Sequence, residues 1–296
     1  MSLLGKIGLG TVQWGMDYGI ANRAGRPSDA EVGRILDRAR TAGISLLDTA
    51  AAYGEAETVI GRLPQTRDFG IVTKTLPWRG ETGPERLAAV AAGIDASLAR
   101  LRRGSVQVLL VHHAEELLSP HGGALWELLE DARATGKAGR IGVSVYDPAQ
   151  LARLLDGFGV EAVQLPLNLY DQRFLRTGML TKLRTANVEV HVRSSFLQGV
   201  LLMQPDNLPA HLSSLREHHI RCAGLLGAAG VTPLQAALGF CLSNGDVAHV
   251  IVGCETQAQL DGILDAGAAV SPAFDTTAFA IDDEALVDPR RWPTVH

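Results

Sequence analysis

Residues 28–48 read SDAEVGRILDRARTAGISLLD, a helical pattern followed at once by a short apolar run. Ser28 stands where a helix N-cap is expected, and Glu31 follows three residues later, a spacing typical of a capping box. The apolar residues of this helix share one face at helical spacing: Val32, Ile35, Leu36 and Ala39. The run at 44–48 then has the length and composition of a buried strand. The stretch therefore predicts a helix that leads directly into a strand.

The same alternation recurs along the whole chain. Apolar runs rich in β-branched residues are expected to be strands at 7–10, 44–48, 69–73, 106–111, 140–145, 162–165, 189–192 and 247–252. Helices are expected at 28–41, 85–101, 125–135, 148–155 and 175–185, several of them closed by glycine. Eight strands with helices between them favour an α/β fold, a closed (β/α)8 TIM barrel, although an open doubly wound sheet has the same alternation.

The glycine-rich run at 8–13, GLGTVQ, helps to choose between these two folds. Gln13 stands where a dinucleotide-binding fingerprint needs its third glycine, so a doubly wound sheet is disfavoured. No linker or low-complexity stretch divides the chain, and barrels of this length form one domain, so residues 1–296 are expected to fold as a unit. Residues 270–296 have little periodicity and three prolines, which predicts a tail lying over the barrel.

Composition restricts the class of partner. The chain has 32 acidic and 27 scattered basic residues, which disfavours nucleic acid and anionic membranes as partners. Three cysteines without C-x-x-C spacing favour structural thiols in a reducing compartment: Cys222, Cys241 and Cys254. No apolar run approaches the roughly 18 residues that a membrane helix needs, and the first residues lack signal-peptide features. We therefore expect a cytoplasmic protein that acts on a small molecule.

Three consecutive strands are expected to end in polar side chains. Asp48 and Tyr53 follow the second strand, Lys74 ends the third and His112 ends the fourth. Active sites of these barrels form at the carboxyl ends of the strands, so the four side chains should share one rim. Each also has an ordinary structural role, as a cap, a packing residue or a salt-bridge partner.

Together these residues predict an acid site for carbonyl reduction. An ammonium about 4 Å from a phenol is worth roughly 4 kcal/mol at an effective dielectric near 20, or at most about three pKa units. We therefore expect Lys74 to lower the pKa of Tyr53 toward neutrality, partly opposed by burial. Asp48 would keep Lys74 charged, and His112 would hydrogen-bond the carbonyl oxygen.

Other histidines and the tryptophans suggest weaker roles. His113 should face away from His112 because strand side chains alternate, and His218 and His219 are expected on a solvated helix face. The candidate cluster near the proposed site has no His-x-His or Glu-x-x-His spacing, so no metal is expected there: Asp48, Glu55, His112 and His113. Candidate walls of a substrate pocket, or ordinary packing residues, are Trp14, Trp78 and Trp292.

The sequence DTAAAYG at 48–54, followed by strands ending in Lys74 and in Leu110-Val111-His112, resembles the catalytic tetrad of the aldo-keto reductases. Leu9-Gly10-Thr11 with Trp14-Gly15 resembles the opening hairpin of that family. The resemblance implies a barrel that binds NADP or NAD and transfers a hydride to or from an aldehyde, ketone or sugar-like hydroxyl. It implies that the cofactor-binding residues are Ser144, Gln164, Arg193, Ser194, Phe196, Leu197, Gln198, Gly199, Gly253, Glu255 and Gln259.

Within this resemblance, Ser144 and Gln164 would hold the nicotinamide carboxamide, the loop at 196–199 would contact the pyrophosphate, and residues from 251 onward would face the adenosine. Val145 stands where many members have asparagine. Arg193 stands where an aromatic ring usually stacks on the nicotinamide, and it either alters cofactor handling or forms an ion pair at the rim.

Cofactor choice is expected to depart from the usual NADP preference. No basic residue occurs at 253–264, where NADP-preferring members bind the 2′-phosphate, whereas Glu255 and Asp261 do occur. This pattern predicts a weakened NADP preference or a preference for NAD. Two other functions stay open: a metal-dependent barrel hydrolase or lyase using His112 and Asp48, and a regulatory protein that binds the cofactor with little turnover.

Overall fold

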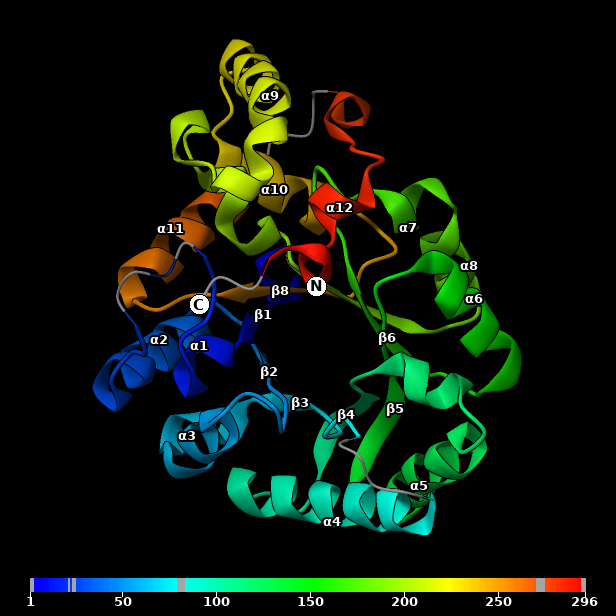
Figure 1. Ribbon diagram of the computed structural model, residues 1–296. Coiled ribbons are helices and arrows are strands. Elements are labelled where there is room, and N and C mark those ends of the chain that lie inside the picture. Colours follow the sequence, from blue (N-terminus) through cyan, green and yellow to red (C-terminus); the bar gives the residue numbers. More distant parts are fainter. Residues whose placement is uncertain (1–2, 21, 23–24, 79–82, 270–274, 294–296) are drawn as a thin grey trace.

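The chain forms a closed barrel of eight parallel strands in sequence order, with helices around it (Figure 1). The computed structural model describes residues 3–20, 22, 25–78, 83–269 and 275–293. The strands are β1 Ile7–Gly10, β2 Leu46–Asp48, β3 Gly70–Lys74, β4 Val106–Val111, β5 Ala138–Ser144, β6 Ala162–Pro166, β7 Glu189–Arg193 and β8 His249–Gly253. The predicted (β/α)8 fold is confirmed, and each predicted strand overlaps an observed one.

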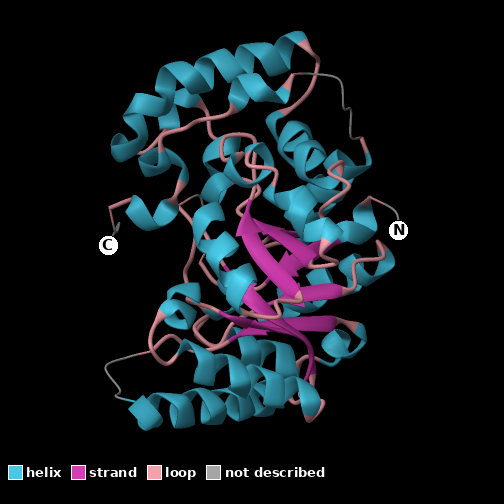
Figure 2. Cartoon of the chain, turned by 90° about the vertical axis from the view of Figure 1, so that its right-hand side faces the viewer, coloured by secondary structure: helices cyan, strands magenta, loops and turns pink. Residues whose placement is uncertain are grey.

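Helices enclose the strands (Figure 2). They are α1 Val12–Gly15, α2 Asp29–Thr41, α3 Ala56–Arg62, α4 Gly83–Leu101, α5 Gly122–Ala134, α6 Pro148–Gly157, α7 Arg173–Arg176, α8 Met179–Thr185, α9 Arg216–Ala228, α10 Pro233–Leu242, α11 Gln257–Ala268 and α12 Glu284–Val287. Short 3-10 helices complete them: η1 Leu4–Lys6, η2 Pro64–Asp68, η3 Ala114–Leu118, η4 Leu197–Leu202, η5 Pro205–Asn207, η6 Ala210–Leu215, η7 Thr276–Phe279 and η8 Pro289–Arg291.

The helix α2 begins after Ser28, whose hydroxyl accepts the N–H of Glu31, and the predicted apolar stripe is buried. Only this half of the predicted capping box forms. The Glu31 carboxylate accepts the N–H of Gln257, at the first turn of α11, so it joins two neighbouring helices. The predicted helix at 175–185 is interrupted, because Gly178 has a φ of 72° and separates α7 from α8.

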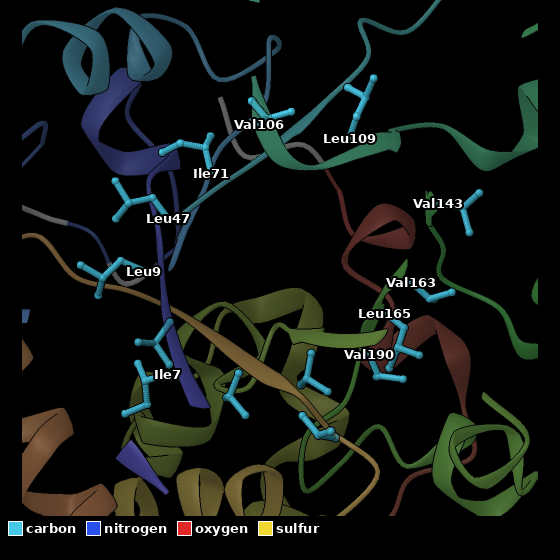
Figure 3. Close-up of a cluster of buried hydrophobic side chains, with 14 of the residues drawn as sticks. Ile7, Leu9, Leu47, Ile71, Val106, Leu109, Val143, Val163, Leu165 and Val190 are labelled. Atoms are coloured by element: carbon cyan, nitrogen blue, oxygen red, sulfur yellow. The ribbon is translucent and has the colours of Figure 1, made fainter. Parts of the chain in front are cut away.

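Side chains alternate along the strands between two apolar layers. One set packs outward against the helices and includes Leu9, Leu47, Ile71 and Val163 (Figure 3). A smaller cluster fills part of the barrel interior: Leu46, Val72, Val108, Leu110, Ala162 and Ile251. This alternation turns Asp48 and Gln164 inward, because their sequence neighbours Leu47 and Val163 pack outward. Lys74, the last residue of β3, is also buried and points inward.

Two expectations from the sequence are wrong. Leu9 and Gly10 belong to the barrel strand β1, which pairs in parallel with β2 and β8, so they form no opening hairpin. Residues before this strand form the turn η1 instead. His219 is 5% exposed and not solvated: Tyr170 Oη lies 2.7 Å from its Nδ1, and the Met203 carbonyl lies 2.8 Å from its Nε2.

The part of the C-terminal tail that the structure describes, residues 275–293, reaches the rim of the barrel. It contains η7, α12 and η8, and the N–H of Ile281 donates to the Tyr170 carbonyl. Residues 270–274 and 294–296 of the predicted tail lie outside the described residues.

In the described part of the chain, no single helix has the length and apolar character to cross a membrane; the segments Ala210–Ala228 and Pro233–Leu242, bent by 86° from one another, meet that test only as a pair.

Candidate active site

A cavity of about 640 Å³ opens at the carboxyl ends of the strands. This volume is within the usual range for small-molecule sites. Its lining includes most of the predicted site residues: Asp48, Tyr53, His112, Ser144, Gln164, Arg193, Ser194, Phe196, Gln198, Gly199, Gly253, Glu255 and Gln259. The cavity lining as a whole brings together residues from six strands, β1, β2, β5, β6, β7 and β8, and from loops that include the one after β4.

A buried ion pair lies at the base of this cavity. Lys74 Nζ is 2.9 Å from both carboxylate oxygens of Asp48 and 2.8 Å from the Thr49 carbonyl oxygen. Gln164 Nε2 donates to Asp48 Oδ1 at 2.6 Å. An ammonium has three N–H donors, so these three acceptors satisfy Lys74. Lys74 itself is 1% exposed and does not line the cavity.

Tyr53 lies above this pair, and Lys74 Nζ is 5.0 Å from the centre of its ring. The ammonium therefore faces the ring and gives its hydrogen bonds to Asp48 and Thr49. Burial of the phenol and the nearby Asp48 carboxylate raise the pKa of Tyr53 above its ordinary value, and the Arg193 guanidinium only partly opposes them. The expectation that Lys74 lowers this pKa toward neutrality is wrong.

His112 stands beside Tyr53, with the ring centres 5.8 Å apart in an edge-to-face arrangement. Burial, reinforced by the charge of Lys74, lowers the pKa of His112 to about 3, so its imidazole is neutral at physiological pH. Its Nδ1 is buried and has no hydrogen-bond partner among the described residues. His113 is exposed at the rim, but it does not face away from His112: the ring centres are 5.4 Å apart in an edge-to-face arrangement, because both residues follow the end of β4 at Val111.

Ser144 and Gln164 are paired residues on the neighbouring strands β5 and β6. Gln164 Oε1 is buried without a partner among the described residues, although its amide nitrogen is bound to Asp48. A buried carbonyl oxygen of this kind requires a donor, which the amide group of a nicotinamide carries. Ser144 and the unpaired acceptor oxygen of Gln164 therefore fit the carboxamide of a nicotinamide cofactor.

The loop after β7 has an unusual backbone at the cavity wall. Ser194, Leu197 and Gln198 have φ values of 59°, 48° and 53°, in the left-handed region that non-glycine residues rarely adopt. Asn168 holds this loop, because its Nδ2 donates to the Ser194 carbonyl at 3.0 Å. Leu197 does not line the cavity: its side chain is fully buried in a second apolar cluster, so a side-chain contact with a ligand is excluded in this conformation.

Arg193 lines the cavity and packs on Tyr146, with its guanidinium carbon 3.8 Å from the ring centre. Its Nη2 donates to the Val145 carbonyl at 3.0 Å. No carboxylate forms an ion pair with it among the described residues, so the rim ion pair considered for Arg193 is not formed there. Arg290 of the tail packs on the same tyrosine at 3.8 Å.

Glu255 and Gln259 line the far end of the cavity and bind each other. The Gln259 side chain accepts the N–H of Glu255 at 2.7 Å and donates to its carboxylate at 3.2 Å. Asp261 forms an ion pair with Arg38 of α2. Among the described residues that line the cavity, Arg193 is the only lysine or arginine.

The tryptophans considered either as cavity walls or as packing residues, Trp14, Trp78 and Trp292, do not line the cavity, and Trp14 is 1% exposed within the core. The described lining contains Tyr18 and Tyr146, which were not singled out from the sequence. Tyr146 comes two residues after β5, at the same rim as the other strand-end residues. Its position just after a predicted strand could have identified it as a cavity residue. Tyr18 lies in the irregular loop after α1, for which periodicity gives no orientation.

The profile of the aldo/keto reductase family matches residues 6–281 of this chain. The chain belongs to the aldo/keto reductase family. Members of this family are generally NAD(P)-dependent oxidoreductases.

Three comparisons show how this aldo/keto reductase chain relates to individual proteins. It is 30% identical over 166 residues to the 6-dehydroglucose reductase of Novosphingobium aromaticivorans, covering 50% of this chain and 51% of that protein. It is 26% identical over 300 residues to the probable voltage-gated potassium channel subunit beta of Oryza sativa subsp. japonica, covering 87% of this chain and 88% of that protein. A solved aldo-keto reductase of Bacillus halodurans, in a holo form, has a TM-score of 0.72 at 20% identity, over 91% and 88% of the two chains.

The alignment with the dehydroglucose reductase thus spans about half of that protein. The solved structure shares the fold of this aldo/keto reductase chain, and its sequence identity is too low to carry more than that.

Replacing Lys74 with methionine tests the buried pair. Lys74→Met leaves the Asp48 carboxylate buried without its cation, so we expect the free energy of unfolding to fall by about 3–5 kcal/mol. The matched control is Lys137→Met, which breaks an ion pair with Asp95 whose side chains are 41% and 61% exposed, and which should cost less than about 1 kcal/mol. Urea denaturation at neutral pH measures the free energy of unfolding of both variants. Equal decreases would show that the buried Asp48–Lys74 pair contributes no more to stability than the exposed pair.

Proposed function

We propose that this chain is an NAD(P)-dependent oxidoreductase that reduces the carbonyl group of an aldehyde, ketone or open-chain sugar, with Tyr53 as the proton donor. The observation that carries the proposal is the convergence of Tyr53, His112 and the Asp48–Lys74 pair at one end of a cavity whose other walls carry the predicted cofactor residues. Family membership supports the reaction class. The relative named 6-dehydroglucose reductase supports a sugar-like carbonyl as substrate.

The protonation states suit proton donation. Tyr53 keeps its proton through the neutral range because its pKa is raised. A phenol with a raised pKa still gives its proton readily to an alkoxide, because an alkoxide is a stronger base than a phenolate. His112 is neutral, so an N–H of its imidazole can hydrogen-bond the carbonyl oxygen without competing as an acid. A nicotinamide cofactor supplies the hydride when bound.

The cofactor residues divide the cavity into three parts in this proposal. Ser144 and the unpaired oxygen of Gln164 would bind the carboxamide. The left-handed turn at residues 197–199 would face the pyrophosphate, and its shape is held by the N–H groups of Leu197 and Gly199, which donate to the carbonyls of Ser194 and Phe196. Glu255 and Gln259 would face the adenosine ribose.

Tyr53→Phe tests the proton donor. The variant keeps the ring beside His112 and loses the hydroxyl, so we expect kcat for aldehyde reduction to fall about 10²–10⁴-fold while the cofactor still binds. Absorbance of NADH and of NADPH, followed separately over a panel of aldehydes and sugars, measures the rate. Tyr170→Phe removes a phenol hydroxyl outside the cavity lining and is the control that should keep its turnover.

Two results would contradict this role. Undiminished turnover in Tyr53→Phe would place the acid elsewhere. Tight cofactor binding by the wild type without any turnover over the panel would instead favour the regulatory cofactor-binding protein that the sequence left open.

The acidic far end of the cavity supports NADH as the preferred cofactor. Glu255 would accept a hydrogen bond from a ribose 2′-hydroxyl and repel a 2′-phosphate, and the cavity lining that the structure describes places no lysine or arginine at that end.

Reversing the charge of Glu255 tests this preference. We expect Glu255→Arg to shift the ratio of the dissociation constants for NADH and NADPH at least about tenfold toward NADPH, equivalent to about 1.4 kcal/mol. Fluorescence titration of each reduced cofactor measures the ratio, and Glu130→Arg, at an exposed position on α5, controls for net charge. A wild type that already binds NADPH much more tightly than NADH would refute the assignment.

A further inference from the structure

A polar cluster lies inside the barrel at the amino ends of the strands, opposite the cavity. Glu189 is the first residue of β7 and His249 the first of β8. Glu189, His191 and Arg193 alternate with the outward-packing Val190 and Val192, so these three share the interior face of one strand. Arg193 lines the cavity, and His191 therefore lies one layer beneath it.

The strand register brings the two imidazoles together. His191 and His249 are direct neighbours across β7 and β8, and their ring centres are 5.0 Å apart at an interplanar angle of 80°. His191 Nε2 is 2.7 Å from Glu189 Oε1. One potential ligand atom from each of Glu189, His191 and His249 lies within 4.8 Å of the other two.

Both imidazoles carry an unsatisfied atom. Nδ1 of His191 and Nδ1 of His249 are buried with no hydrogen-bond partner among the described residues, and the two residues are only 1% and 8% exposed. Buried polar atoms of native proteins nearly always have partners, so two neighbouring exceptions call for a ligand. A metal ion is the ligand that takes up imidazole nitrogens and a carboxylate oxygen together.

We propose that Glu189, His191 and His249 form a binding site for a divalent transition-metal ion, with Zn²⁺ the best match. Two imidazoles and one carboxylate form a common zinc ligand set, with solvent supplying the fourth ligand of a tetrahedron. With the Nε2–H of His191 donating to Glu189, the unpartnered Nδ1 of His191 carries the lone pair for coordination, so binding displaces no proton from that hydrogen bond.

A neighbouring side chain holds the Glu189 carboxylate in place. Arg140 Nη1 lies 2.8 Å from Glu189 Oε2 and fixes the carboxylate from outside, as groups behind metal ligands commonly do. The Arg140 side chain is 49% exposed, so the site has an approach from solvent at this end of the barrel.

The site would have a structural role. It joins β7 to β8 inside the barrel at the end opposite Tyr53 and His112, so it offers no ligand to a substrate in the cavity. The proposal is independent of the proposed reductase activity, because its observables are metal binding and thermal stability.

The experiment is a titration of chelator-treated whole chain with Zn²⁺ against a chromophoric zinc indicator, with a parallel Co²⁺ titration read by visible absorption. We expect one equivalent of Zn²⁺, a tetrahedral Co²⁺ spectrum and a rise in Tm on binding. His191→Ala should lose the Co²⁺ spectrum and weaken Zn²⁺ binding at least tenfold. Glu189→Gln, which keeps the side-chain shape, should also weaken it at least tenfold.

His121→Asn is the matched control, because it removes a histidine from the start of α5, far along the chain from the cluster, and should leave Zn²⁺ binding unchanged. Circular dichroism checks that each variant is folded. If His191→Ala does not fold, the Zn²⁺ affinity of Glu189→Gln tests the proposal. The proposal is wrong if the wild type binds no Zn²⁺, or if it binds Zn²⁺ with the same affinity and stoichiometry as both cluster variants.

Discussion

The buried ion pair between Asp48 and Lys74 is the interaction on which the rest of the candidate active site depends. Moving two charges out of water costs several kcal/mol per ion, and only good geometry with further hydrogen bonds offsets that cost. Here all three donors of Lys74 are used, and Asp48 also accepts a bond from Gln164. The pair and its hydrogen bonds tie β2, β3 and β6 together under the cavity. A closed parallel barrel makes this possible, because it brings the ends of strands distant in sequence to one rim.

The same pair influences the protonation of the two groups above it. Burial is the main cause that raises the pKa of Tyr53, and the negative charge of Asp48 adds to it; burial is likewise the main cause that lowers the pKa of His112, and the positive charge of Lys74 adds to it. A protonated phenol and a neutral imidazole result, side by side and facing the cavity. In the proposed function this arrangement would donate a proton and bind a carbonyl oxygen without an acidified tyrosine.

The sequence predicted the barrel and the position of Asp48, Tyr53 and His112, because apolar periodicity locates strands and parallel strands converge at their carboxyl ends. It could not predict the pKa of Tyr53, which depends on where the donors of Lys74 point. Leu197 was misplaced because the left-handed turn of its loop directs the side chain into the core. His191 and His249 are distant in sequence, and only the register of β7 against β8 brings them together.

The pH dependence of kcat/KM for aldehyde reduction is the most direct test of the central claim that Asp48 and burial keep Tyr53 protonated. Proton donation requires the protonated phenol, so activity is retained below the pKa of Tyr53 and lost as the pH rises through it. With that pKa raised above the ordinary phenol value of about 10, and His112 uncharged above its pKa of about 3, the profile should be flat from about pH 5 to about pH 9. A fall centred near neutral pH, absent from the residual activity of Tyr53→Phe, would show that the phenol is acidified and would contradict the claim.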